Sequence, residues 1–457
     1  MSWRSGTATR NDDPELDTAP ESRRVGIAGI VAGSLAAGLA AAVVLPFLPV
    51  ATVDENFATA MVLLGFALGW ALLAGLSTRF TDQPQRWAVA PAVFMGLAGA
   101  VVLLVPDTVV DALGWVWPPA LLVLVVWVFL RAKRDLHSRT RAWLLNPVLG
   151  ILVVVSLAGG YETVSRSVEA QPTMHGRLVD VGPYRLHLEC AGSGRPTVIL
   201  EPGGGASAAT LGWIAPAVAR TTRVCVYDRA GRGWSDAAPT PPDGAQIATD
   251  LHTLLTRAHV PGPYVLAGHS FGGLYVMSFA DQYPGQVAGL VLVDSTAPRS
   301  TPVPPQHPGS YSVVKHLSAL VSTTSRLGVG RLIAQLSFSE LPPQSRDEAR
   351  ASAATGKELA SFVDEFGVAN RSVSEAGQLV TLHAKPLVVL TAGRGHDVEW
   401  TKAQDELATL SSDSLHQVVA GATHQSLVDN PVHAVAVSRA IHKVVISVRT
   451  GTSLTGP

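Results

Sequence analysis

A serine framed by two glycines lies between a predicted strand and a predicted helix. The run Gly268-His269-Ser270-Phe271-Gly272 follows the apolar segment 264–267 and precedes a helix-like stretch over 274–280. In this context the G-x-S-x-G pattern is typical of a nucleophile elbow, a turn so tight that both outer positions must be glycine. The turn exposes the hydroxyl and directs the N–H of Phe271 toward an oxyanion that forms on an attacked carbonyl. Ser270 is therefore the candidate nucleophile.

A serine hydroxyl becomes a good nucleophile only when a base removes its proton, and histidine usually does so. Among the fourteen histidines, His424 is the best candidate. It lies in a short loop, Gly421-Ala422-Thr423-His424, between a strand-like run and a predicted helix over 432–446. His269 adjoins the nucleophile, and on an elbow its side chain should point away from the serine.

Two aspartates are candidates for the acid that orients this histidine. Asp397 follows the predicted strand 386–392, and the stretch between it and His424 has room for one helix and one strand. Asp294 ends the predicted strand 288–294 and is the alternative, with Glu399 a weaker third choice. We predict Asp397 as the acid and keep Asp294 as the alternative.

From about residue 175 onward, short β-rich runs alternate with amphipathic stretches. This rhythm predicts a mostly parallel sheet with helices on both faces. The predicted strands cover 176–181, 184–190, 197–201, 223–228, 264–268, 288–294, 386–392 and 414–419, and the predicted helices cover 211–220, 245–258, 271–283, 400–410 and 432–446. Residues 297–384 interrupt the rhythm with helix-like segments such as 311–321 and 346–366, which predicts an inserted lid over the site.

The order of these parts resembles the α/β-hydrolase superfamily over residues 175–450. Four motifs carry the resemblance: Leu200–Gly205 after the third strand, Val226–Ser235 after the fourth, the elbow at Ser270, and Gly421–His424 after the last strand. The resemblance implies an eight-stranded, mostly parallel sheet with a helical cap after strand six. It also implies a triad in the chain order nucleophile, acid, histidine.

The resemblance also implies roles for several loop residues. A second oxyanion donor should follow strand 197–201, where many relatives have His-Gly. This chain has Pro202, which lacks an N–H, so we predict Gly204, with Gly203 and Gly205 as alternatives. Asp228 and Arg229 would form a structural turn and salt-bridge pair.

The family's strand order also bears on the two cysteines. It would make the strands of Cys190 and Cys225 neighbours, so that either a disulfide or two buried thiols could result.

The first third of the chain is unusually apolar. Mean hydropathy over the whole chain is +0.28, and only 15% of the residues are charged. Five stretches without Asp, Glu, Lys or Arg are long enough to consider as bilayer spans, at 25–50, 57–77, 87–105, 112–130 and 142–161. We therefore predict a five-helix transmembrane bundle over 25–165, preceded by a disordered cytoplasmic tail over 1–24.

Charges in the loops predict the orientation. Basic and acidic loops alternate along the bundle, beginning with Arg23-Arg24 before the first span and acids only in loop 51–56. By the positive-inside rule the N-terminus is cytoplasmic. An odd number of spans then makes the hydrolase domain extracytoplasmic, in an integral protein of the cell membrane.

The bundle itself offers little chemistry. No ionisable residue lies at mid-depth, where transporters usually keep one. Gly29-x-x-x-Gly33 and Gly65-x-x-x-Gly69 predict close helix packing. The near-neutral balance of 34 basic and 35 acidic residues gives no sign of nucleic-acid binding, and no motif indicates a metal or another cofactor.

These observations predict a membrane-anchored serine hydrolase. Ser270, His424 and Asp397 would cleave a small-molecule carboxylic ester, and an apolar ester would suit the lipid bilayer in which the bundle sits. An aminopeptidase or amidase on the same triad is the nearest alternative. A non-catalytic, hydrolase-like receptor and a membrane transporter are alternatives from other classes.

Overall fold

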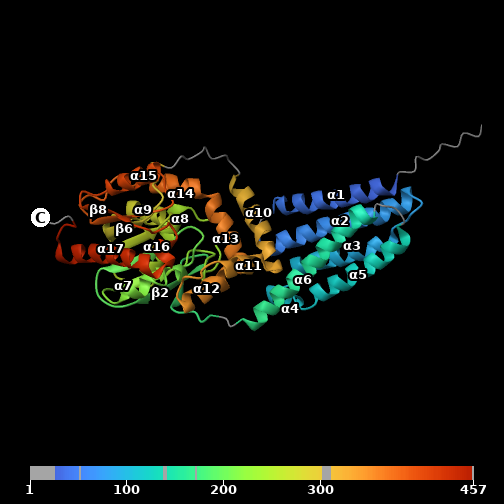
Figure 1. Cartoon of the computed structure of the whole chain (residues 1–457), viewed down its shortest axis with the longest axis horizontal. Coiled ribbons are helices and arrows are strands. Elements are labelled where there is room, and N and C mark those ends of the chain that lie inside the picture. The colour runs from blue at the N-terminus through green and yellow to red at the C-terminus, as the bar shows by residue number, and fades with distance from the viewer. Residues whose placement is uncertain (1–25, 51–52, 137–140, 170–171, 301–309, 455–457) are drawn as a thin grey trace, which may run out of the picture.

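The computed structural model describes residues 26–50, 53–136, 141–169, 172–300 and 310–454. A helical bundle occupies one end of the molecule and an α/β region the other, with a group of helices between them (Figure 1). The predicted tail over 1–24 lies outside the described residues.

About five apolar helices precede the sheet, as predicted. By length and composition five helices of the described chain could span a membrane, or six if a pair bent by 50° counts as one span. One of the five is the C-terminal helix α17, which packs on the sheet instead. The bundle consists of α1 (Ile27–Val44), η1 (Leu45–Phe47), α2 (Glu55–Phe80), η2 (Arg86–Ala88), α3 (Val89–Leu104), the bent pair α4 (Asp107–Leu113) and α5 (Trp117–Asp135), a π-helical turn (Arg141–Leu145), and α6 (Asn146–Val168).

Helices α1 and α2 pack so closely that their backbones touch. A Cβ added at Gly65 would lie 2.2 Å from the backbone nitrogen of Ala42, and one at Gly69 would lie 2.8 Å from Cα of Gly38. The packing role predicted for Gly65 and Gly69 is therefore confirmed. The role predicted for Gly33 is wrong, because no atom of another described helix lies within 4 Å of a Cβ added there.

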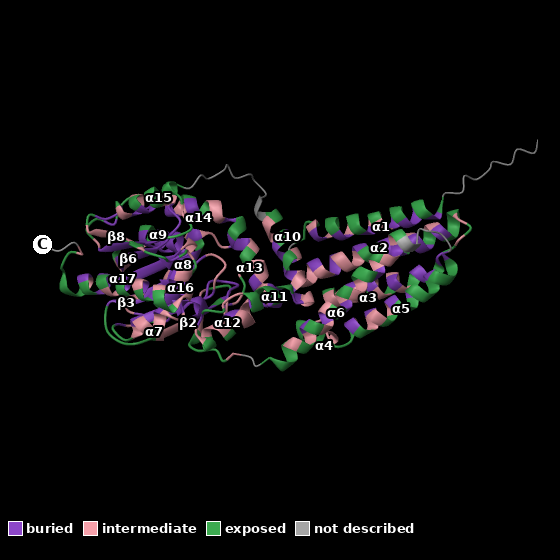
Figure 2. Cartoon of the chain, viewed as in Figure 1, coloured by how far each residue is buried: buried purple, intermediate pink, exposed green. Residues whose placement is uncertain are grey.

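The bundle turns large apolar side chains outward. Leu104 is 78% exposed, and Leu97 and Val123 are also well exposed. Figure 2 shows exposed residues along the outside of the bundle and buried ones concentrated in the sheet. An outward apolar surface of this kind suits a lipid surrounding. Lipid tails are as apolar as these side chains, so burying the side chains inside the protein would give no hydrophobic stabilisation.

The α/β region contains one eight-stranded sheet in the order β1-β2-β4-β3-β5-β6-β7-β8. Only β2 runs antiparallel to its neighbours. The predicted eight-stranded, mostly parallel sheet is confirmed, and the strand bounds agree closely with the predicted ranges. They are β1 (Arg177–Asp180), β2 (Arg185–Ala191), β3 (Thr197–Glu201), β4 (Val224–Tyr227), β5 (Tyr264–His269), β6 (Val287–Val293), β7 (Leu387–Ala392) and β8 (Ser414–Val419).

Helices cover both faces of the sheet, because the central strands are apolar on both sides. All residues of β3 and β5 are buried. One face packs against α8 (Gly244–Arg257), α9 (Phe271–Gln282) and α15 (Val398–Ala408). The other packs against α7 (Ile214–Ala219), the short α16 (Ser426–Asp429) and α17 (Pro431–Thr450), whose Ile441, Val444 and Val445 are fully buried.

Between β6 and β7 the described chain forms a helical cap. Its elements are α10 (Ser310–Ser322), η6 (Thr323–Leu327), α11 (Val329–Leu336), α12 (Pro343–Ala353), α13 (Gly356–Gly367) and α14 (Ala369–Ala376). The predicted helix-like stretch 346–366 is two helices, because Thr355 has an extended backbone and its side chain caps α13 through the N–H of Glu358. In Figure 1, α10, α11 and α13 lie between the bundle and the sheet.

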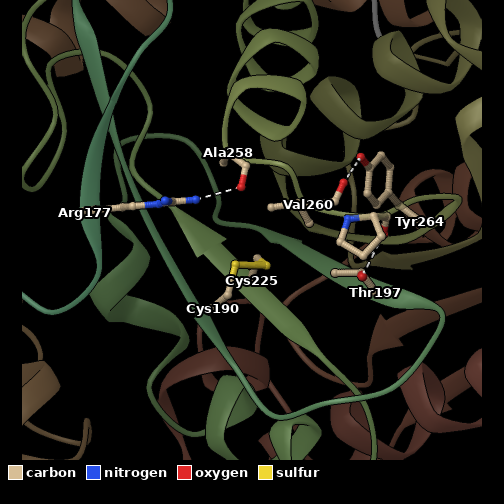
Figure 3. The surroundings of a disulfide bond; sticks show 8 residues. Arg177, Cys190, Thr197, Cys225, Ala258, Val260 and Tyr264 are labelled. Carbon is tan, nitrogen blue, oxygen red and sulfur yellow. Dashed lines mark hydrogen bonds between the residues drawn. A yellow bond between two sulfur atoms is a disulfide. The ribbon is translucent and has the colours of Figure 1, made fainter.

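A disulfide joins the two cysteines. Cys190 on β2 and Cys225 on β4 face each other in the antiparallel register, with Cα atoms 4.1 Å apart (Figure 3). Of the two possibilities left open by the sequence, the structure has the bonded pair.

Candidate active site

Ser270 occupies the sharp turn between β5 and α9. Its backbone has φ 55° and ψ −122°, a conformation that costs a non-glycine residue energy and often marks a functional site. A Cβ at Gly268 would lie 2.4 Å from the carbonyl oxygen of Gly272, and a Cβ at Gly272 would lie 2.5 Å from that of Glu201. Both glycines are therefore required by backbone contact, which is the reason for the G-x-S-x-G spacing.

The structure pairs His424 with Asp294, the alternative acid. His424 Nδ1 lies 2.7 Å from Asp294 Oδ2. Asp397 is exposed and caps α15, where its Oδ1 accepts a hydrogen bond from the backbone N–H of Trp400 at 2.8 Å. The predicted pairing of Asp397 with His424 is therefore wrong: Asp397 follows the expected strand, but its carboxylate is used to start the next helix.

Asp294 is completely buried and surrounded by donors. Its Oδ2 also lies 2.6 Å from His396 Nε2, and its Oδ1 accepts hydrogen bonds from Trp400 Nε1 at 3.0 Å and from the backbone N–H of Ala392 at 3.1 Å. Burial raises the pKa of this carboxyl, but the hydrogen bonds from His424, Ala392, Trp400 and His396 outweigh it and lower the pKa to about 2. Asp294 is thus a carboxylate at any physiological pH.

The same side chains form the one cluster of possible metal ligands in the described residues. Ligand atoms of Asp294, His396 and His424 all lie within 4.8 Å of one another. The two histidine nitrogens are 2.6 and 2.7 Å from the shared carboxylate oxygen. Ligands of one zinc ion, each about 2.0–2.2 Å from the metal, would be roughly 3.3 Å apart in a tetrahedral site. The observed nitrogen–oxygen distances are those of hydrogen bonds and are too short for ligands of a common metal ion.

His269 holds the loop of His424 against the elbow. Its Nε2 lies 3.0 Å from the backbone carbonyl of His424, and the two rings are 4.6 Å apart. Burial, and then the charge of His424, lower the pKa of His269 to about 3, so the ring is neutral and donates its Nε2 proton to that carbonyl. As expected of the residue before the nucleophile, the His269 side chain is hydrogen-bonded to another residue than the serine. Its contact with the His424 carbonyl brings the Ser270 and His424 segments together.

Three contributors to this arrangement were not predicted: His269 as a support for His424, and His396 and Trp400 as partners of Asp294. The His396 and Trp400 rings stack at 4.7 Å with an angle of 8° between their planes. The sequence offers one signal, a histidine and a tryptophan within eight residues of the end of β7. It does not show that the loop folds back onto the end of β6.

The loop after β3 lies directly beside the nucleophile. A Cβ at Gly203 would be 3.2 Å from Ser270 Cβ, and one at Gly204 would be 3.1 Å from the Phe271 ring. The N–H of Gly205 donates to Glu365 Oε2 at 3.0 Å, so it is already in use. Of the three glycines considered as oxyanion donors, Gly203 and Gly204 are left. Phe271 is the first residue of α9, so its N–H has no acceptor within the helix.

A buried group of charged side chains is hydrogen-bonded to the backbone of the loop after β3. Arg229 pairs with Glu201 at 2.6 Å and with Glu365 at 3.0 Å, and it donates to the carbonyls of Pro202 and Gly203. Arg232 pairs with the other oxygen of Glu365 at 2.9 Å. Burial raises the pKa of Glu365, but the two arginines outweigh it and lower that pKa.

The predicted pair of Asp228 and Arg229 does not form. Asp228 Oδ2 lies 2.8 Å from His187 Nδ1 and also accepts the N–H of Trp234, while its Oδ1 accepts the N–H of Ala208. Both residues are buried and bonded within the fold, and their structural role stays a prediction. The correction concerns their partners: Asp228 contacts His187, whereas Arg229 contacts Glu201 and Glu365.

Three phenylalanines form an apolar wall next to the elbow. The rings of Phe271 and Phe366 are 5.2 Å apart, and those of Phe366 and Phe362 are 4.7 Å apart. Phe362 and Phe366, on α13 of the cap, are 48% and 44% exposed. Exposed aromatic rings beside a candidate nucleophile are suited to contact an apolar part of a ligand.

A family model described as the alpha/beta hydrolase fold matches residues 196–431. The match covers more than half of the chain and includes the elbow, Asp294 and His424. The chain belongs to the α/β-hydrolase family.

The chain is also similar to several other proteins. An uncharacterized protein of Schizosaccharomyces pombe is 26% identical over 345 residues, which are 68% of this chain and 61% of that protein. An uncharacterized vacuolar membrane protein of Saccharomyces cerevisiae is 31% identical over 132 residues, 24% of this chain and 20% of that protein. A thermophilic esterase from Thermogutta terrifontis has a TM-score of 0.43 at 22% identity, over 60% of this chain and all of that one. The chain thus spans less than two thirds of either relative.

Proposed function

We propose that this protein is a membrane-anchored serine hydrolase that cleaves a carboxylic ester through an acyl-enzyme on Ser270. The observation that carries the proposal is the hydrogen bond of His424 to Asp294 while the His424 loop is bound to His269, the neighbour of the nucleophile. Family membership makes hydrolysis the expected reaction class. The elbow and the paired histidine favour a serine as its nucleophile.

The proposed reaction begins when His424 takes the proton of the Ser270 hydroxyl. The serine oxygen attacks the ester carbonyl carbon, and the N–H groups of Phe271 and Gly204 stabilise the resulting oxyanion. Collapse of this intermediate breaks the bond to the alcohol, and His424 returns its proton to the leaving oxygen. Water, activated by the same histidine, then attacks the acyl carbonyl and releases the acid and free Ser270.

Asp294 serves this cycle as a fixed anion. Because its pKa is lowered to about 2, it remains a carboxylate while His424 gains and loses a proton. It holds the Nδ1 proton of the imidazole and stabilises the imidazolium that forms.

The apolar wall of Phe271, Phe362 and Phe366 supports an apolar acyl group as the preferred substrate part. Two half-exposed rings would lose their contact with water when such a group binds. A small-molecule ester with an apolar chain is therefore the proposed substrate class.

The proposed location is the cell membrane, with the N-terminus in the cytoplasm and the catalytic region outside. The alternating charges of the bundle loops favour this orientation. The disulfide between Cys190 and Cys225 also favours it, because disulfides persist mainly in oxidising compartments.

The test uses a fluorophosphonate probe and p-nitrophenyl butyrate on the full chain in lipid nanodiscs. Wild type should be labelled and should hydrolyse the ester. Ser270→Ala should lose labelling and reduce kcat by about 10⁴-fold or more. Ser438→Ala, which removes a serine hydroxyl from α17, is the matched control and should behave as wild type. Full activity in Ser270→Ala would refute the proposal.

A further inference from the structure

One end of the cap helix α13 is in contact with the bundle. A Cβ added at Gly356, its first residue, would lie 1.9 Å from Oε2 of Glu55, the first residue of α2. At the same corner Arg326 of η6 pairs with Glu55 at 2.7 Å and donates to Asn56 at 2.7 Å. The start of α13 is therefore seated on the start of α2.

Two neighbouring cap helices, α10 and α11, make further contacts with the bundle. Gly367 at the end of α13 packs on Val314 of α10, and His316 of α10 has Nε2 3.2 Å from the carbonyl of Leu48, just after η1. Arg331 of α11 pairs with both carboxylate oxygens of Glu162 on α6, at 2.8 and 3.1 Å. The cap thus contacts the ends of three bundle segments, and it is held there by ion pairs as well as by packing.

The other end of α13 reaches the candidate oxyanion loop. The carboxylate of Glu365 accepts the N–H of Gly205 at 3.0 Å and the hydroxyl of Tyr275 at 2.7 Å. It also pairs with Arg229 and Arg232. Arg229 in turn donates to the carbonyls of Pro202 and Gly203. The backbone of this loop is therefore held at two successive residues after Glu201 and again at the N–H of Gly205.

Both contacts belong to one short, continuous helix. Nine residues separate Gly356 from Glu365, a rise of about 14 Å at 1.5 Å per residue. An α-helix of this length transmits a displacement along its axis without a hinge, since every turn is hydrogen-bonded. A shift of α2 against the cap would therefore move Glu365 against the loop.

We propose that α13 is a strut between the bundle and the oxyanion loop, and that Glu365 is the positioning residue through which the bundle sets the loop for catalysis. The inference rests on the proposed function. Glu365 holds the N–H of Gly205, and this fixes the preceding peptide so that the N–H of Gly204 faces the oxyanion. The interaction matters most when charge develops on the substrate oxygen, so its loss should lower kcat and leave KM nearly unchanged.

The first test compares Glu365→Gln with Glu358→Gln. Both glutamates lie on α13, are 6% exposed and contact Arg232, but Glu358 accepts the N–H of Gly233 instead of one in the oxyanion loop. With p-nitrophenyl butyrate and the full chain in nanodiscs, Glu365→Gln should lower kcat by about 10²-fold with KM within threefold. Glu358→Gln should lower kcat by less than about threefold at a similar cost in thermal midpoint. Equal losses in the two variants would overturn the positioning role.

The second test addresses the bundle end and does not touch the buried charges. Gly356→Leu forces α13 away from Glu55 and should lower kcat by about fivefold, with fluorophosphonate labelling slowed in proportion. Gly75→Leu, at a bundle position with open space around it, is the control and should leave both unchanged. An unaltered kcat in Gly356→Leu would overturn the coupling.

Failure of the inference and failure of the proposed function have different signatures. If ester turnover persists in Ser270→Ala, the proposed function is wrong. If turnover requires Ser270 but is insensitive to Glu365 and Gly356, only the strut is wrong.

Discussion

The bundle and the hydrolase region differ in the polar side chains that they bury. The hydrolase region buries many ionisable side chains, including Arg229, Arg232, Glu201 and Asp294, all nearly inaccessible. In the described part of the bundle, the buried polar side chains are Ser34, Ser77, Gln85, Ser156 and Glu162. The one ionisable group among them, Glu162, pairs with Arg331 of the cap.

The two regions are consequently sensitive to different changes. Buried charges in the hydrolase region are paired with one another, as Arg229 and Arg232 are with Glu365. Removing one charge therefore leaves its partner buried and uncompensated. The α1–α2 contact in the bundle depends on the absence of side chains at Gly65 and Gly69, so added volume is what harms it. Charge substitutions at buried positions should therefore harm the hydrolase region most, whereas in the bundle the damaging change is added volume at the α1–α2 contact.

The largest effect expected is that of Asp294→Asn on turnover. The amide cannot hold the His424 imidazole as a carboxylate does, and kcat should fall by about 10³–10⁴-fold. Asp397→Asn is the matched control, since asparagine also caps helices well, and its kcat should stay within about twofold of wild type. The measurement is ester hydrolysis with active-site titration. A large loss in Asp397→Asn and none in Asp294→Asn would reverse the assignment of the acid.

In the bundle, Gly65→Leu should cost about 3 kcal/mol of stability, because the side chain enters a backbone contact that has no room for it. Gly75→Leu adds the same volume where nothing lies within 4 Å and should be nearly neutral. Thermal unfolding in detergent micelles measures both. Equal midpoints for the two variants would show that the α1–α2 contact does not govern bundle stability.

The smallest effect concerns acid. The folded pKa of Asp294, about 2, is below its ordinary value of 3.8, so its stabilising contribution is complete above about pH 5 and is lost as pH falls through 2. The difference in unfolding free energy between wild type and Asp294→Asn should shrink by about 2 kcal/mol over that range. Denaturant unfolding at a series of pH values gives this difference. A constant difference between pH 5 and pH 2 would mean that the Asp294 pKa is not lowered by folding.

Local sequence patterns predicted the fold well, because parallel buried strands are short apolar runs between turn residues. The elbow and the His424 loop were visible for the same reason, since each is a contiguous motif. The choice between Asp294 and Asp397 was not decided by spacing, because each follows a strand and only the tertiary fold shows which carboxylate meets the imidazole. Contacts such as Glu365 with Gly205, 160 residues apart, leave no local pattern.

Helix α17 has a practical consequence for experiments on topology. It is apolar enough to be counted as a membrane crossing, yet it lies in the hydrolase region against the sheet (Figure 1). A count based on hydropathy alone would therefore add a crossing after the sheet and place whatever follows α17 on the opposite side of the membrane from Ser270. We expect a reporter enzyme fused after α17 to lie on the same side as Ser270, so its signal would report which side of the membrane the candidate active site faces.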